Sequence, residues 1–226
     1  MRAIVVVGTD TGVGKTVASC GLARALAGRG LRVAWQKWVA TGLADGATDL
    51  DLCRQLAPEL LWAEPALHQP QVFSLPASPH LAAEEEGREV DPDAVLVACQ
   101  RLAAQVDVLV VEGVGGVLVP LRRDLLLADF LAKTGLPAVV VARTGLGTIN
   151  HSLLTLEALR QREIPVLGMI LSDEGEDVDE RLAADNMAIV ASLGRVEILA
   201  RLPRLADLGD APIFLTEAAG RLLGRF

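Results

Sequence analysis

Residues 8–16, which read Gly-Thr-Asp-Thr-Gly-Val-Gly-Lys-Thr, limit the possible fold of this chain more than any other stretch. An apolar run, residues 3–7, precedes them, and a helical pattern begins at Val17. A strand, a glycine-bearing turn and Lys-Thr at a helix start together build a phosphate-binding loop. Backbone N–H groups face the anion, the lysine neutralises the outer phosphates, and the threonine hydroxyl reaches Mg²⁺. This phosphate loop (residues 8–16) predicts a nucleoside triphosphate site. A plain G-x-x-x-x-G-K-T loop would have glycine at position 9, where this chain has Thr9. The loop sequence therefore leaves open which class of nucleotide-using protein this is.

Two kinds of apolar segment alternate along the chain. Short runs rich in Val, Ile and Leu predict strands covered on both faces, and longer segments with helical spacing lie between them. This alternation predicts a doubly wound α/β fold, a mostly parallel sheet with helices on both faces, whose ligands bind at the carboxyl ends of the strands. The expected strands are residues 3–8, 31–36, 107–111, 137–142, 166–171 and 196–201, and the expected helices are residues 15–29, 49–57, 91–105, 124–134, 149–162 and 178–192.

Composition and charge narrow the class of protein. A chain of 226 residues that is 51% apolar fits one compact domain, residues 1–226. The net charge of −8 argues against nucleic acid or an anionic membrane as a partner. No apolar run reaches the ~18–20 residues of a membrane span, and no secretion signal is expected. The three cysteines, Cys20, Cys53 and Cys99, form no C-x-x-C pair and are expected to be reduced core thiols of a cytoplasmic protein.

Three stretches are less informative. Residues 58–90 contain five prolines and form the least regular part of the chain. The acidic run at residues 173–180 is interpreted as solvated surface. The tail after Leu205 shows no motif.

Two residues follow the second expected strand. Lys37 lies just past it, beside whatever the phosphate loop holds, and its compact ammonium suits a substrate with developing negative charge. A surface lysine with its head group in water is the alternative. Thr41 can position a substrate through its hydroxyl, although alone it is an ordinary loop threonine.

Two carboxylates stand at the boundaries of expected elements. Asp49 begins a helix, where a carboxylate is often a cap or a dipole partner; the alternative is a magnesium ligand. Asp51 cannot face the same way as Asp49 on a helix. Glu112 directly follows the apolar run 108–111, and the glycines at positions 113, 115 and 116 let the backbone and a ligand approach closely. Glu112 is therefore placed to be a second magnesium ligand opposite Lys-Thr.

Five motifs occur in order along the chain: residues 8–16, Lys37-x-Val39-x-Thr41-Gly42, Ser78-Pro79-His80, Val111-Glu112-Gly113-x-Gly115-Gly116 and Gly147-x-Ile149-Asn150-His151. Together they resemble dethiobiotin synthetase, and the resemblance runs from about residue 3 to 205. The resemblance implies a P-loop NTPase-like fold and an ATP-dependent ligase of biotin biosynthesis, in which 7,8-diaminononanoate, CO₂ and MgATP give dethiobiotin, ADP and phosphate. One amine captures CO₂ as a carbamate, and the carbamate oxygen attacks the γ-phosphoryl group to give a carbamic-phosphoric anhydride. The second amine then closes the ring and expels phosphate.

The resemblance also implies roles for individual residues. Lys15 would hold the β- and γ-phosphates, and Lys37 would stabilise the carbamate and the transferring phosphoryl group. In the family, the substrate carboxylate docks at a helix N-terminus of the other subunit of a homodimer, and the matching segment here is residues 146–150. The implied catalytic residues are Lys37, Lys15 and Thr11; the metal ligands are Thr16, Asp49 and Glu112; the substrate contacts are Thr11, Thr41, Leu146, Gly147 and Asn150; and the nucleotide contacts are Gly12, Val13, Gly14, Lys15, Thr16, Val17, Asp49, Glu112, Gly113, Val114, Gly115, Ser172, Asp173, Leu202, Pro203 and Arg204.

Two positions depart from the family pattern. Trp38 stands where the family usually has proline after the lysine, so a differently shaped Lys37 loop is expected. Ser172-Asp173 replaces the Asn-Asp that the family commonly offers to adenine. A serine hydroxyl cannot donate and accept in the fixed geometry of a carboxamide. We therefore expect weak discrimination between ATP and other triphosphates.

Two other classes share this layout of strands and helices. A ParA/MinD-type switch ATPase has the loop Lys-Gly-Gly-x-Gly-Lys-Thr, and here Asp10 stands where the extra lysine would be. A cobyrinate-type amide synthase would need an added glutaminase domain, for which 226 residues leave no room. Both alternatives are less favoured than the synthetase.

Overall fold

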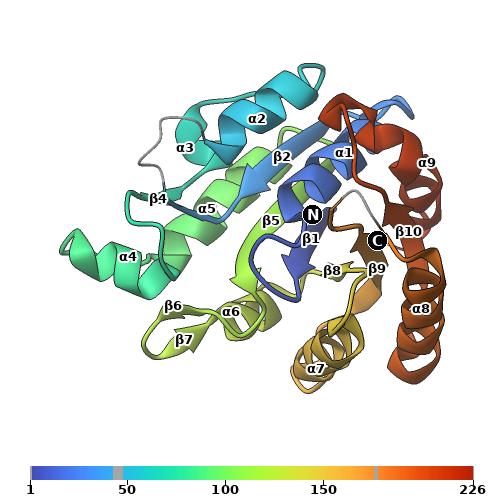
Figure 1. Ribbon diagram of the computed structural model, residues 1–226. Coiled ribbons are helices and arrows are strands. Elements are labelled where there is room, and N and C mark those ends of the chain that lie inside the picture. The colour runs from blue at the N-terminus through green and yellow to red at the C-terminus, as the bar shows by residue number, and fades with distance from the viewer. Residues whose placement is uncertain (1, 43–47, 176–177, 226) are drawn as a thin grey trace.

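A parallel sheet lies at the centre of the computed structural model, which describes residues 2–42, 48–175 and 178–225 (Figure 1). Its strands run in the order β10-β9-β8-β1-β5-β2 and all pair in parallel. Every residue of β1 is buried, as a strand covered on both faces requires. The predicted α/β fold and its six strands are confirmed: β1 (Ala3–Gly8), β2 (Val33–Lys37), β5 (Val108–Gly116), β8 (Ala138–Arg143), β9 (Val166–Ser172) and β10 (Ile198–Leu202).

Helices cover both faces of this sheet, as the sequence predicts (Figure 1). Successive strand side chains point to opposite faces, so Ile4 and Val6 belong to one hydrophobic core while Ala3, Val5 and Val7 belong to the other. The first core is completed by α1 (Lys15–Ala27), α2 (Asp49–Leu56) and α9 (Ala211–Leu222), and the second by α5 (Pro92–Ala103), α6 (Leu127–Thr134), α7 (Thr148–Arg160) and α8 (Glu180–Gly194).

Several short elements were not expected from the sequence. Residues 58–90 contain α3 (Pro65–His68), β4 (Gln71–Phe73) and α4 (Pro79–Glu85), and β4 pairs with β3 (Val39–Thr41). β6 (Pro120–Arg122) and β7 (Leu125–Leu126) form a small antiparallel pair, and a 3₁₀ turn, η2, spans Leu208–Asp210. The tail after Leu205 is also structured, because α9 packs along α1. Gly21 makes this contact possible: a Cβ there would lie 2.8 Å from the Cβ of Ala211.

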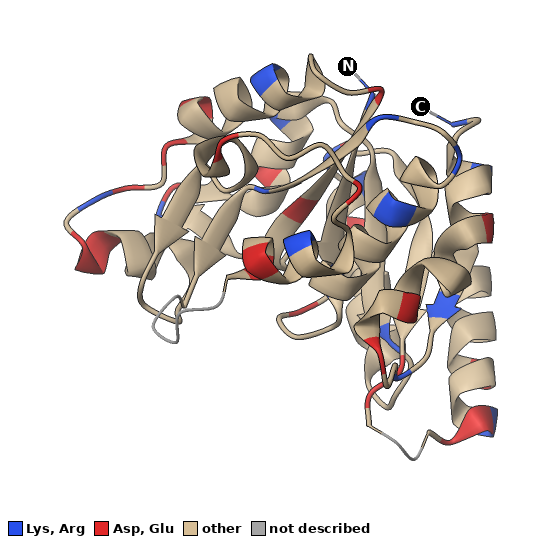
Figure 2. Ribbon diagram, turned by 90° about the horizontal axis from the view of Figure 1, so that it is seen from above, with Lys and Arg blue, Asp and Glu red and all other residues tan. Residues whose placement is uncertain are grey.

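Charged residues of both signs are interspersed along the ribbon (Figure 2). The interpretation of the run 173–180 as solvated surface is wrong for Asp173, which is buried. Its Oδ1 accepts hydrogen bonds from Thr144 Oγ1 at 2.7 Å and from Arg201 Nε at 2.9 Å. Glu180 is exposed and pairs with the same arginine, while residues 176–177 lie outside the described residues. Within the described part of the chain the three cysteines are buried and unpaired, as expected.

The strand order places the functional residues at one edge of the sheet. The chain passes from β1 to β2 on one side, and β8 pairs with β1 on its other side, so the winding direction reverses at β1. Ligands of doubly wound sheets bind at such a reversal, outside the carboxyl ends of the strands. The phosphate loop follows β1 there, and Lys37 is the last residue of β2. Glu112 lies inside β5 rather than directly after it as expected, because β5 continues to Gly116, and it stands beside Lys37 in the sheet register. None of the described helices is long and apolar enough to span a membrane.

Candidate functional site

The phosphate loop has a backbone that glycine alone adopts easily. Gly12 and Gly14 have φ angles of 73° and 91°, and Gly14 is the N-cap of α1. A Cβ at Gly14 would lie 2.9 Å from Ser172 Oγ, so the loop packs tightly against the end of β9. Lys15 turns back over the loop and donates to the carbonyl oxygen of Asp10 at 2.7 Å. The N–H groups at the start of α1 thus face an opening rimmed by a lysine.

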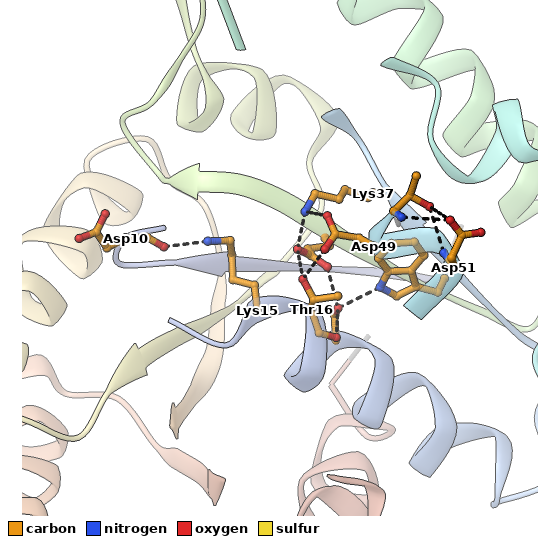
Figure 3. A network of polar contacts seen from close by, with 10 residues as sticks. Asp10, Lys15, Thr16, Lys37, Asp49 and Asp51 are labelled. Atoms are coloured by element: carbon orange, nitrogen blue, oxygen red, sulfur yellow. Dashed lines mark hydrogen bonds and ion pairs between the residues drawn. The ribbon is translucent and has the colours of Figure 1, made fainter. Parts of the chain in front are cut away.

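Four polar side chains from four elements meet beside this loop (Figure 3). Lys37, at the end of β2, donates to Glu112 Oε1 at 3.0 Å and also pairs with Asp49 Oδ2. Thr16 Oγ1, in the first turn of α1, lies 3.0 Å from Glu112 Oε1 and 3.3 Å from Asp49 Oδ1. Side chains separated by up to 96 residues in the sequence therefore form one cluster.

Two charged side chains of this cluster, Lys37 and Glu112, are buried, so the electrostatic interactions between them are stronger than in water. Glu112 is 1% exposed and the Lys37 side chain 11%. Burial alone lowers the pKa of Lys37, but its bonds and attraction to Glu112 and Asp49 prevail, so the net pKa is raised. Burial lowers the pKa of Lys15 to about 8, with Lys37 adding to the shift and Glu112 opposing it. Lys37 is therefore a firmly held cation at neutral pH.

The two aspartates that begin α2 have different partners. Thr48 Oγ1 accepts from the backbone N–H of Asp51 at 3.1 Å, and Asp51 Oδ2 accepts from the N–H of Thr48 at 3.0 Å. This capping box satisfies the helix start without Asp49. Asp49 instead faces Lys37 and Thr16, as Figure 3 shows. This position suits a ligand of Mg²⁺ as well as an ion-pair partner of Lys37.

The donor set suits Mg²⁺ bound together with a nucleotide. Thr16, Asp49 and Glu112 present hydroxyl and carboxylate oxygens within one cluster, and Mg²⁺ prefers such hard oxygens. No group of three or more His, Cys, Asp or Glu side chains suited to a metal occurs among the described residues.

Two cavities border the start of α1. The larger has a volume of about 730 Å³ and is lined by Thr11, Gly12, Gly14, Lys15, Thr16, Val17, Lys37, Thr41, Asp49, Glu112, Val114 and Gly115, together with residues 76–79. The second measures about 560 Å³ and is lined by Gly12, Val13, Gly14, Val17, Ser172, Asp173, Leu202, Pro203 and Arg204, among others. Gly113 lines neither cavity; it is buried in β5 with its α-carbon facing Leu127 and Val7.

The predicted substrate segment 146–150 lies elsewhere on this chain. Leu146, Gly147 and Asn150 line neither cavity, and Leu146 is 94% exposed. Gly147, with a φ of 89°, is the N-cap of α7, so the segment does open a helix. The structure thus does not bring these three residues to the cavity of their own chain.

Trp38 shapes the Lys37 loop in a way that proline cannot. Its backbone N–H donates to the carbonyl oxygen of Glu112 at 3.1 Å, a bond for which proline has no hydrogen. Its indole is 1% exposed and meets the Phe130 ring edge-on at 4.9 Å. Lys37 reaches Glu112 with Trp38 in this place, and the Trp38 N–H adds a backbone hydrogen bond between the end of β2 and β5.

The base side of the site has few free polar side chains. Ser172 is pressed against Gly14, and the Asp173 carboxylate is occupied by Thr144 and Arg201. Residues 76–79 line the larger cavity, although the sequence analysis assigns them no role. The motif Ser78-Pro79-His80, one of the five that resemble the family, is the sequence feature that indicates this segment.

A glycine-rich loop at the reversal of a parallel sheet, with a buried lysine and two carboxylates beside it, defines a P-loop nucleotide-binding protein. A family model described as an AAA domain matches residues 2–212. A Rhizorhabdus wittichii protein named ATP-dependent dethiobiotin synthetase BioD is 47% identical over 220 residues, which cover 96% of this chain and 95% of that protein. Proteins of the same name from Brucella ovis and Anaeromyxobacter dehalogenans are each 42% identical, covering 91% and 92% of this chain and 87% and 92% of their own lengths. The chain belongs to the ATP-dependent dethiobiotin synthetase family.

Solved structures show the same fold at low sequence identity. The MinC:MinD cell division protein complex of Aquifex aeolicus includes a chain with a TM-score of 0.65 and 15% identity, covering 100% of this chain and 97% of that one. The cell division ATPase MinD of Pyrococcus furiosus has a TM-score of 0.56 and 17% identity, covering 99% of both chains. These likenesses concern the fold alone and do not favour a switch ATPase over a synthetase.

Proposed function

We propose that this protein carries out the ATP- and Mg²⁺-dependent carboxylation and ring closure of 7,8-diaminononanoate to dethiobiotin. As a family member it is an ATP-dependent cyclo-ligase of biotin biosynthesis. The observation that carries the detailed proposal is the joining of Lys15, Thr16, Lys37, Asp49 and Glu112 at one cavity. A site for amine carboxylation with ATP needs cations near the γ-phosphate and an open space for a second substrate, and this cavity offers both.

The proposed chemistry asks mainly for positioning and charge stabilisation. A substrate amine captures CO₂ as a carbamate, losing a proton. The carbamate oxygen attacks the γ-phosphorus, the bond to the β–γ bridging oxygen breaks and ADP leaves. The second amine then attacks the carbamoyl carbon of the resulting anhydride and expels phosphate, losing a proton as the ring closes. Lys15 and the N–H groups of the phosphate loop hold the β- and γ-phosphates, while Lys37 stabilises the carbamate and the transferring phosphoryl group. Thr11 and Thr41 orient the diamine or carbamate from the cavity wall. Mg²⁺ held by Thr16, Asp49 and Glu112 would neutralise phosphate charge.

The decisive assay follows both substrates. Phosphate release from ATP is expected only when the diamine and bicarbonate are both present, with dethiobiotin identified by mass spectrometry. Omission of either one should reduce the rate to background. Stimulation by DNA, lipid or glutamine without the diamine would instead contradict the synthetase and favour one of the alternative classes.

The proposed assembly is a homodimer in the cytoplasm, with the substrate site at the subunit interface. Large apolar side chains lie exposed beside the phosphate loop: Leu118 and Leu154 are 50% and 56% exposed and line a shallow hollow with Thr11. A second copy seated there would supply the segment 146–150 that this chain does not bring to its own cavity. The start of α7 in that segment suits a substrate carboxylate.

Charge placed on this surface is expected to separate the subunits. The double variant Leu118→Arg/Leu154→Arg should sediment as a monomer in analytical ultracentrifugation and raise the KM for the diamine at least about tenfold, since buried arginines without partners oppose association. The Kd for ADP should stay unchanged. Val97→Arg, at a 53% exposed position on α5, is the matched control and should remain dimeric. A monomeric wild-type chain with a low diamine KM would contradict the proposal.

Base selectivity is expected to be weak. Ser172 is packed on Gly14, and Asp173 is already bonded to Thr144 and Arg201. Among the described residues that line the second cavity, none carries a carboxamide that would distinguish adenine from other bases. We expect kcat/KM for ATP, CTP and GTP to agree within about tenfold, a free-energy spread of about 1.4 kcal/mol. Competition binding with ADP, CDP and GDP should give the same ranking. A thousandfold preference for ATP would show that backbone and shape suffice for discrimination.

A further inference from the structure

A buried hydrogen-bond chain lies behind the proposed metal ligand Glu112. Ser19, one turn after Lys15 on α1, and Trp35, in the middle of β2, are both 0% exposed. The indole Nε1 of Trp35 donates to Ser19 Oγ at 2.9 Å. Ser19 Oγ lies 3.2 Å from Glu112 Oε2 and 3.1 Å from the carbonyl oxygen of Thr16. The proposed reaction assigns no role to Ser19 or Trp35.

The hydrogen-bonding capacities of these groups set the direction of the chain. An indole N–H only donates, and a serine hydroxyl has one proton and two acceptor sites. Trp35 therefore occupies an acceptor site of Ser19, whose proton is left for Glu112 Oε2 or the Thr16 carbonyl. That carbonyl already accepts within the helix, and a buried carboxylate is the stronger acceptor. The proton of Ser19 is thus directed to Glu112.

Because Ser19 binds Oε2, the two carboxylate oxygens of Glu112 have different partners. Oε1 faces Lys37 and Thr16 in the cavity, and Oε2 is held by Ser19 in the interior. The last torsion of a glutamate is broad and roughly two-fold, so without a tether the carboxylate can rotate. The Trp35 end of the tether is anchored, because Trp35 sits in a paired strand and its carbonyl oxygen contacts His68 Nδ1 at 2.5 Å.

We propose that Ser19 and Trp35 are positioning residues that fix the rotation of Glu112 and thereby set the affinity of the site for a divalent cation. The proposal rests on the metal-binding role proposed for Glu112 above. Partners of a metal ligand that lie outside the coordination sphere typically contribute 10–100-fold to metal affinity by orienting the ligand. Trp35 acts through Ser19, so its effect should vanish when the serine hydroxyl is absent.

The test measures binding of Mn²⁺ to the ADP-bound protein by electron paramagnetic resonance. Ser19→Ala should raise the Kd for Mn²⁺ about tenfold or more, and Trp35→Phe several-fold. The double variant should bind Mn²⁺ no more weakly than Ser19→Ala alone, because the two residues act in series. The matched controls are Ser152→Ala, a buried helical serine on α7, and Trp62→Phe, whose indole donates to the Ala57 carbonyl. Both controls should keep the wild-type Kd.

The outcomes separate this inference from the proposed function. If the wild-type ADP complex binds no Mn²⁺, the metal site itself is wrong. If the wild type binds Mn²⁺ and Ser19→Ala binds it equally well, the positioning role is overturned. ADP binding without metal and thermal melting report whether each variant is folded. Should Trp35→Phe not fold, Ser19→Ala against Ser152→Ala still decides the question.

Discussion

Replacing Lys37 by alanine is expected to lower kcat by about 10²–10³-fold while changing the Kd for ADP less than threefold, a loss typical of one donor that stabilises transition-state charge. Lys37 is a cation at neutral pH because Glu112 and Asp49 raise its pKa despite burial. Lys37 lines the same cavity as Lys15, but it is bonded to Glu112 and Asp49, whereas Lys15 is bonded to the phosphate loop. We therefore expect Lys37 to serve the transferring group more than the bound diphosphate. Stopped-flow phosphate release and calorimetric ADP binding measure the two quantities separately.

The chain offers a matched control for this variant, since it contains only three lysines, Lys15, Lys37 and Lys133. Lys133 lies in the last turn of α6, away from both cavities, and Lys133→Ala should retain the wild-type kcat. Lys37→Ala also leaves the buried Glu112 without a cation, so a lower melting temperature is expected in the absence of divalent metal. Loss of ADP binding with an unchanged kcat would contradict the assigned role and make Lys37 a nucleotide ligand.

The central sheet could be predicted because one requirement, burial on both faces, applies to every residue of its strands. Strands buried on both faces must be apolar throughout, so all six sheet strands could be located from the sequence. β3, β6 and β7 are two or three residues long, too short for any periodicity to indicate them. The tail after Leu205 was underestimated. Its buried residues Ala211, Leu215, Ala218 and Leu222 recur at helical spacing, but small side chains suit close packing on α1 without forming a strong amphipathic pattern.

The candidate site was predictable where a polar residue ends a buried strand. Lys37 is such a residue. Glu112 was expected to be another, but β5 continues past it to Gly116; the sheet register nevertheless brings the two side chains together. From the sequence, Asp49 is either a helix cap or a metal ligand. In the structure, Thr48 and Asp51 cap the helix, so Asp49 is not needed there. Asp173 was misjudged because its partner Arg201 is 28 residues away on a neighbouring strand. Contacts of that kind, like the bond between Trp35 and Ser19, have no local signature in the sequence.

Replacing Glu112 by glutamine should change the metal dependence of the reaction, which Lys37→Ala should leave unaltered. Glutamine keeps the shape of the side chain but removes the charge that binds Mg²⁺ and pairs with Lys37. We expect the Mg²⁺ concentration for half-maximal rate to rise at least about 10–100-fold, and kcat at saturating Mg²⁺ to fall about 10²-fold or more because one charge-stabilising group is lost. A magnesium titration at fixed ATP gives both values.

Asp51 provides the matched control for this second variant. Its carboxylate lies two residues from Asp49, is exposed, and caps α2 through Thr48. Asp51→Asn should lower the melting temperature slightly, since it removes a negative charge from the first turn of α2, worth about 0.3–1 kcal/mol, and should leave the magnesium titration unchanged. If Glu112→Gln keeps the wild-type magnesium dependence while kcat falls, the carboxylate serves only to hold Lys37. The metal ligands would then reduce to Thr16 and Asp49, and the tether from Ser19 would position the lysine instead.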